Sequence, residues 1–196
     1  QAAEIHALHL DDLKAATAAH KQAIDASALQ PASIDAVIQA ASRSTEPRDH
    51  ADALLIGFQK LSNPQDRIHA GYRAARILAD LAGDPATAKG ILNRCVELDP
   101  HSQPVIKLLR EVSTQTEDWA TVYDLRRIEA NAVEGTARVW HLLAAAYATM
   151  EIQGIDASAV ALEILNLEGG HPGALSVLER AALLQNDPSR LAGVYR

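Results

Sequence analysis

Few residues of this chain combine the types and the spacing that metal chemistry needs. His6 and His9 could share one face of a helix, because residues three apart are neighbours on its surface. A zinc site needs at least three protein ligands, and no HExxH motif accompanies this pair. We therefore predict solvated or capping roles for the histidines. His101 and His171 are expected to belong to turns beside Pro100 and Pro172.

A glycine pair is the only candidate for a phosphate loop. Gly169 and Gly170 are followed by His171 and Pro172. A nucleotide-binding loop of the Walker type would continue with Lys and Ser or Thr after a strand, and both features are missing. Gly followed by Pro is typical of a helix that ends there, so we predict a helix terminus.

Nucleophilic or acid–base catalysis has no clear candidates either. Cys95 is the single cysteine, so an intrachain disulfide is excluded, and the thiol is expected in a small buried position. Asp11 and Asp12 are paired carboxylates without a pocket-forming motif around them. We predict no catalytic, cofactor or metal site. A lone cysteine fits reducing and oxidising compartments equally, so localisation stays open.

Composition indicates packed helices. The chain has 196 residues, 48% hydrophobic but only 4% aromatic, so its core must consist of small and aliphatic side chains. A formal charge of −7, with the charges interspersed, argues against nucleic-acid binding, which needs clustered Lys and Arg. No apolar run approaches the roughly 20 residues of a membrane span. These features predict a soluble all-α protein without a nucleic-acid partner and without a membrane span.

Apolar residues recur at intervals of three and four, and N-capping signals separate the segments. Asp84-Pro85, Asp118, Asp156 and Asp187-Pro188 are expected helix starts. Four helices are predicted between residues 66 and 131: 66–82, 84–98, 102–114 and 118–131. Trp119 and Trp140 lie near helix starts, and we favour core positions for both over exposed partner anchors.

The chain resembles itself when it is shifted by 72 residues, which halves to 36 for one helical hairpin. Capping residues, turn prolines and apolar positions coincide, while polar residues between them differ. The coincident pairs are Ile5 with Ile77, Asp12 with Asp84, Asp84 with Asp156, Pro100 with Pro172, Val105 with Val177, Val122 with Val194, and Tyr123 with Tyr195. A stacked structural repeat requires this pattern.

The order of residues in one hairpin resembles the tetratricopeptide repeat (TPR) family. A large residue comes first, then a Gly-Asp turn, a small residue, and a proline in the next turn. The residues that carry the resemblance are Tyr72, Gly83-Asp84, Ala88, Leu92, Cys95 and Pro100, with "ELDP" closing the unit. The resemblance implies a right-handed α-solenoid of antiparallel helical hairpins.

The resemblance is clearest from Asp66 to Arg196, whereas residues 1–65 are expected to be divergent TPR-like hairpins. By the repeat, both ends of the chain cut through helices. We therefore expect further repeats or domains beyond them, and the uncapped ends could also stack between copies as a homo-oligomer.

The resemblance also implies a concave groove lined by the first helix of each hairpin, suited to a peptide or a partner helix. The residues expected to line it are Arg73, Ile77, Asp80, Lys107, Glu111, Gln115, Ala145 and Thr149. Their mixed charge lacks the Lys, Arg and Asn set of a carboxylate clamp.

The sequence thus predicts a protein-interaction scaffold or assembly segment of a larger protein or complex. Two alternatives stay open: an accessory region of an enzyme whose catalytic domain lies outside this segment, and a self-assembling structural subunit.

Overall fold

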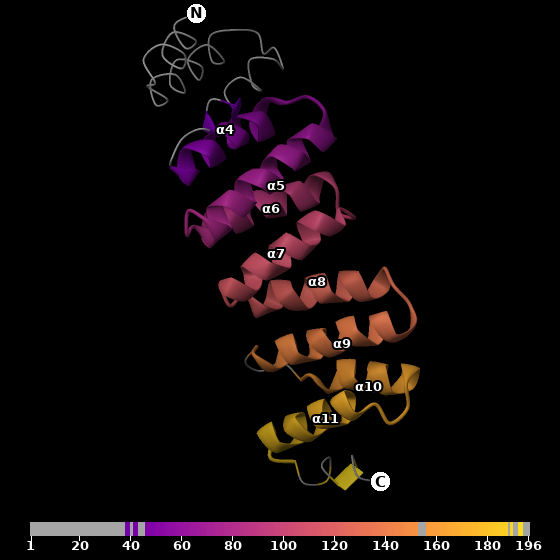
Figure 1. The fold of residues 1–196 in the computed structure, drawn as a ribbon. Coiled ribbons are helices and arrows are strands. Elements are labelled where there is room, and N and C mark those ends of the chain that lie inside the picture. Colours follow the sequence, from indigo (N-terminus) through magenta and orange to yellow (C-terminus); the bar gives the residue numbers. More distant parts are fainter. Residues whose placement is uncertain are drawn as a thin grey trace, which may run out of the picture. The chain divides into compact units, whose positions relative to one another are not determined.

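The computed structural model describes residues 38–39, 41–42, 46–152, 156–187, 189 and 192–193. Within these ranges the chain forms eight helices, α4 to α11, and no strand (Figure 1). The predicted all-α class is confirmed. The described chain falls into two compact units, one up to Val112 and one from Ser113, and each is considered by itself.

The first unit contains α4 (Pro47–Lys60), α5 (Pro64–Asp80), α6 (Pro85–Leu98) and most of α7 (Gln103–Gln115). In Figure 1, α4 lies beside α5, and α5 beside α6. Leu54, Phe58, Leu78 and Leu92 are fully buried between them.

Gly71 allows these three helices to approach closely. A Cβ atom added there would lie 2.7 Å from both the Cys95 Sγ of α6 and the Phe58 Cδ2 of α4. No real Cβ makes such contacts, so glycine is required for this packing. Two arginines cover the Phe58 ring from α5 and α6, with the guanidinium carbons of Arg67 and Arg94 at 5.7 and 4.9 Å from its centre.

The second unit contains α8 (Trp119–Asn131), α9 (Gly135–Met150), α10 (Ser158–Leu167) and α11 (Pro172–Leu184). Helix α9 is central, because it packs against α8, α10 and α11. The core of the second unit is built largely from alanine, valine and leucine, as the composition predicts. The members of this core are Ala130, Val139, Leu142, Leu143, Ala145, Ala146, Ala157, Val160, Ala161, Ile164, Ala174 and Val177.

The predicted helix starts at Asp84 and Asp118 are confirmed, and the one at Asp156 lies one residue before the observed N-cap. Asp84 and Asp118 are N-caps, and each accepts a hydrogen bond from the backbone N–H three residues on, at 3.1 and 3.2 Å. Asp156 instead lies one residue before Ala157, which is the N-cap of α10. Its carboxylate accepts a hydrogen bond from Ser158 N at 2.9 Å. The predicted start at Asp187-Pro188 lies partly outside the described residues.

The glycine pair and His171 lie between the end of α10 and the start of α11, as predicted for a helix terminus. Helix α10 ends at Leu167, and Gly170 has a φ of +73°, a conformation that favours glycine. His171 is the N-cap of α11, and its Nδ1 accepts from Ala174 N at 3.3 Å. His6 and His9 lie outside the described residues.

Helices α5 and α9 share one pattern of burial, but not at the expected shift. Helix α9 begins 71 residues after α5, at Gly135 against Pro64. At this shift Ile68 coincides with Val139, and the pair Ala74-Ala75 coincides with Ala145-Ala146, all of them buried. The shift of 72 predicted from sequence is therefore one residue too long for this helix.

Helices α7 and α11 share a pattern of burial at an interval of 69 residues. Helix α11 begins 69 residues after α7, at Pro172 against Gln103. Buried Val105 and Leu108 then coincide with buried Ala174 and Val177. The predicted pairing of Val105 with Val177 also joins two buried residues, but it does not follow the helix starts, because α10 is four residues shorter than α6.

Candidate interaction surface

The predicted groove residues on α5 and α7 mostly reach solvent. Arg73 and Asp80 are exposed on α5, and Ile77 between them is half-buried. On α7, the exposed residues are Lys107, Glu111 and Gln115. Their side chains are accessible, but whether they bind a partner stays a prediction.

The prediction that two residues of α9 line the groove is wrong, because both are buried. Ala145 is 0% exposed and Thr149 is 3% exposed. The Thr149 hydroxyl donates to Ala145 O at 2.7 Å, inside the packed face of the helix. The cause is the interval of 71 rather than 72, which rotates the expected face into the core. At the observed interval, the α9 residue that coincides with Arg73 is Ala144.

The exposed face of α9 instead carries two aromatic side chains. Trp140 is 67% exposed and Tyr147 is 45% exposed. They lie seven residues apart on one side of the helix, with half-buried Ala144 between them. We name Ala137, Trp140, Ala144 and Tyr147 the α9 face. The interpretation of Trp140 as a core residue is wrong, whereas Trp119 is half-buried.

The aromatic pair differs from most other exposed apolar residues in its place on the helix. Leu167 ends α10, Leu183 and Leu184 end α11, and Leu81 follows α5. Side chains at helix ends are often exposed without a functional reason. Trp140 and Tyr147 lie within α9, the helix that contacts every other helix of its unit.

Helix α11 borders the α9 face on one side. A Cβ atom on Gly173 would lie 2.9 Å from Leu143 Cδ2, so the first turn of α11 closely approaches the middle of α9. This contact fixes one flank of the α9 face.

A polar cluster joins α8 to α9 on another side. Glu129 is 8% exposed, and its Oε2 lies 3.2 Å from Arg126 Nη1 and 3.3 Å from His141 Nδ1. Sequence reasoning missed these three residues, because their contact depends on how α8 and α9 are paired. A buried carboxylate is tolerated when it is paired in this way.

A second cluster links three helices. Glu163 of α10 accepts hydrogen bonds from Arg127 of α8 and, at 3.3 Å, from Arg138 of α9. Burial raises the pKa of Glu163, but the hydrogen bonds and charges of both arginines outweigh burial and lower it. Together the two clusters tie α8, α9 and α10 into one framework behind the α9 face.

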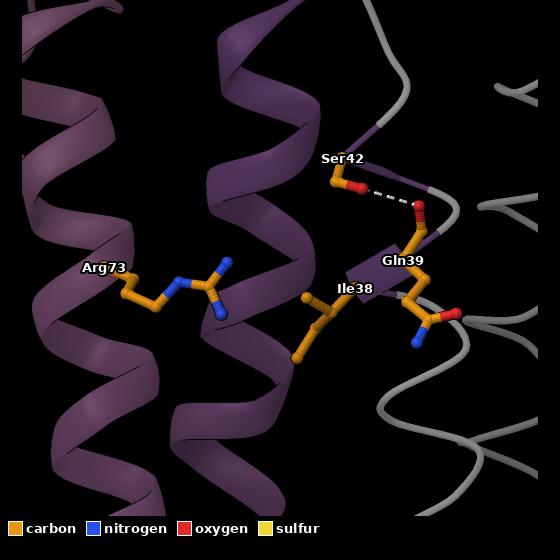
Figure 2. Close-up of a pocket in the computed structure, with 4 residues that line it drawn as sticks. All are labelled: Ile38, Gln39, Ser42 and Arg73. Atoms are coloured by element: carbon orange, nitrogen blue, oxygen red, sulfur yellow. Dashed lines mark hydrogen bonds between the residues drawn. The ribbon is translucent and has the colours of Figure 1, made fainter.

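One pocket of about 280 Å³ lies in the first unit and is lined by Ile38, Gln39, Ser42 and Arg73 (Figure 2). The Ser42 hydroxyl is already used, because it donates to Gln39 O at 2.8 Å. Burial lowers the pKa of His50, and the positive charge of Arg73 lowers it further. Among the described residues that line it, Arg73 is the one charged side chain, and none of them carries a carboxylate, imidazole or thiol for acid–base or nucleophilic catalysis.

The thiol of Cys95 is buried. Burial raises its pKa to about 11, although the charges of Arg94 and Arg67 act in the opposite direction. The thiol is therefore protonated at neutral pH, and it lies beside Gly71 as a small apolar side chain.

Within the described part of the chain, His, Cys, Asp and Glu form no group of three that could hold a metal ion. None of the helices there is both long enough and apolar enough to cross a membrane. No family model, no curated protein and no solved structure matches the chain.

Proposed function

We propose that the chain is a protein-interaction scaffold, a TPR-like solenoid of helical hairpins that presents the α9 face to a protein partner. The observation that carries this proposal is the exposure of Trp140 and Tyr147 on a helix whose other sides are packed. Trp and Tyr are enriched among residues that dominate binding energy.

Three features support the solenoid part of the proposal. Successive helices pack as neighbours within each unit, from α4 to α6 and from α8 to α11. The burial pattern of α5 returns in α9, and that of α7 returns in α11. Two ion pairs, Arg48 with Asp84 and Arg127 with Glu163, each join residues 36 apart, the length expected of one hairpin.

The chemistry of the surface favours a protein partner over a nucleic acid. The formal charge is −7, and the arginines of the second unit that border α9, Arg126, Arg127 and Arg138, are all engaged with carboxylates. An aromatic pair without a surrounding cationic surface is suited to apolar side chains rather than to phosphates.

The experiment compares capture by the wild-type chain and by variants of its surface. We expect Trp140→Ala with Tyr147→Ala to abolish capture of a partner from an extract of the source organism. Leu162→Ala is the matched control. The exposure of Leu162, 51%, lies between those of Tyr147 and Trp140, but this residue belongs to α10, outside the α9 face. Binding of the purified partner should weaken at least about tenfold for the double variant, as expected for loss of a hot spot.

A partner retained equally by the double variant would contradict the assignment of the α9 face. The same experiment with Lys107→Ala and Glu111→Ala tests the exposed face of α7, which the sequence predicted as part of the groove. Loss of binding in these variants alone would move the interaction surface to α7.

A further inference from the structure

The pocket of the first unit places one cation opposite an apolar side chain. Its volume is about 280 Å³, and its described lining consists of Ile38, Gln39, Ser42 and Arg73. In Figure 2, Arg73 extends from α5 across α4 toward Ile38. Pockets for drug-sized ligands occupy about 300–1,000 Å³, so this one lies just below that range. A ligand of this pocket must therefore be a small molecule.

The guanidinium of Arg73 is available for pairing. Within the described ranges it forms no ion pair, whereas Arg76, three residues further on, pairs with Asp80 at 3.5 Å. An unpaired guanidinium attracts a carboxylate, because its parallel N–H groups fit both carboxylate oxygens. The pKa of His50 on α4 is lowered first by burial and then by the charge of Arg73. Arg73 therefore acts on its surroundings as an uncompensated positive charge.

The rest of the lining favours an organic monoanion. Ile38 packs against the buried Ala41 and Ala53, so its apolar side chain has a defined place in the wall. The Ser42 hydroxyl donates to Gln39 O at 2.8 Å, and its proton is not available to a ligand. A dianion such as phosphate would find no second cation in the described lining. One guanidinium and one apolar side chain instead match a single negative charge on a short hydrocarbon chain.

We propose that this pocket binds a small monocarboxylic acid, whose carboxylate pairs with Arg73 and whose hydrocarbon chain packs against Ile38. The site belongs to the first unit and uses no residue of the α9 face, so it goes beyond the proposed function and does not depend on it. It gives the chain a small-molecule ligand in addition to a protein partner.

The test titrates the full chain with acetate, propionate and butyrate at constant ionic strength, with chloride as the reference anion. Nuclear magnetic resonance follows the methyl signals of Ile38 and the imidazole signals of His50, which a His50→Gln variant assigns. Bound carboxylate should raise the pKa of His50, because it neutralises the charge of Arg73 while burial still lowers the pKa. Affinity should rise about fourfold for each methylene that packs against Ile38. Butyramide has the same chain without the charge and should not bind detectably.

Two variants of α5 separate pairing with Arg73 from a general effect of charge. Arg73→Gln removes the charge but keeps a long polar side chain with good helix propensity. We expect it to weaken butyrate binding at least about tenfold and to raise the pKa of His50 without any ligand. Arg76→Gln is the matched control, because Arg76 lies on the same helix but outside the described lining, and it should leave butyrate affinity unchanged. Unchanged circular dichroism shows that both variants remain folded.

Several results would overturn the inference. Equal binding of butyrate and butyramide would mean that the pocket does not select a charge. Stronger binding of inorganic phosphate would assign the pocket to a dianion, and stronger binding of a short peptide through its free C-terminus would assign it to the chain end of a partner protein. No perturbation by any acid, or full butyrate affinity in Arg73→Gln, would remove the site. None of these results bears on the α9 face, whose own variants test the proposed function.

Discussion

Helices α5 and α9 are built on the same plan, yet they present different surfaces. At the interval of 71 residues, both helices bury an Ala-Ala pair and a β-branched residue six positions before the first alanine. On the exposed side, His69, Arg73 and Arg76 of α5 coincide with Trp140, Ala144 and Tyr147 of α9. The shared positions are those that pack, so the exposed face is free to carry a different function in each helix.

The arginine near the start of each helix also coincides but has different partners. Arg67 of α5 donates from its Nε to Phe58 O at 2.9 Å and lies over the Phe58 ring. Arg138 of α9 bonds Glu163 instead. Similar residues at equivalent positions thus stabilise the two units by different interactions, one with an aromatic ring and one with a carboxylate.

The buried positions of the two helices also differ in residue type, most of all where α5 has Gly71 and α9 has Leu142. We expect Leu142→Ala to show the largest effect, a loss of about 2–5 kcal/mol, because it leaves a cavity in a fully buried site. Denaturant unfolding followed by tryptophan fluorescence measures this directly, since both tryptophans lie in the second unit. Tyr147→Ala is the control and should change stability by less than about 0.5 kcal/mol.

Changing Gly71 to Ala tests the other side of this comparison. The added Cβ would collide with Cys95 and Phe58, and we expect a loss of about 1–3 kcal/mol from overpacking. The rate at which Cys95 is alkylated in the native protein measures this loss of stability, because the buried thiol reacts only when the first unit opens. An unchanged alkylation rate in Gly71→Ala would mean that α4, α5 and α6 are less closely packed than described.

The raised pKa of Cys95 adds a pH dependence to the first unit. The folded-state pKa of about 11 exceeds the ordinary value of 9.0, so unfolding releases a proton between these values. Stability from this group is complete below about pH 9 and is lost as pH rises toward 11. Cys95→Ala should remove this part of the alkaline decline, and an identical decline in the variant would contradict the assignment.

Glu163 should give the smallest effect, at the opposite end of the pH scale. Its pKa is lowered from the ordinary value of 4.5, so its contribution is present above that pH and is lost as pH falls through the folded-state pKa. Solvent screens the half-exposed cluster, so Glu163→Gln should cost less than about 1 kcal/mol at neutral pH. The variant should lose less stability than the wild type between pH 7 and pH 4.

Local signals in the sequence were sufficient to predict the helices. The four predicted between residues 66 and 131 agree with α5 to α8 within two residues at each end, because aspartate caps, proline at the first turn and glycine at the ends act over a few residues. Cys95 as a buried residue and His171 as a cap follow from the same kind of information.

The register between helices could not be predicted in this way. Loop and helix lengths both vary along the chain, because seven residues join α9 to α10 where four join α5 to α6, and α10 is four residues shorter than α6. The interval between equivalent helix starts is therefore 71 for α9, 73 for α10 and 69 for α11. An error of one residue turns a helix by 100°, which moved the predicted groove onto Ala145 and Thr149. The pair Arg127 and Glu163 was accessible to sequence reasoning, because oppositely charged residues 36 apart match the hairpin length, whereas the cluster at Glu129 has no such signal.

The proposed function requires Trp140 to be exposed in the isolated chain and covered in the complex. Acrylamide quenching of the Trp119→Phe variant isolates this residue, because the chain contains two tryptophans. Acrylamide should quench Trp140 efficiently in the isolated protein, because its side chain is 67% exposed, and a captured partner bound at saturation should protect it strongly. Protection of Trp140 in the isolated chain, or equal quenching with and without the partner, would contradict the proposed function.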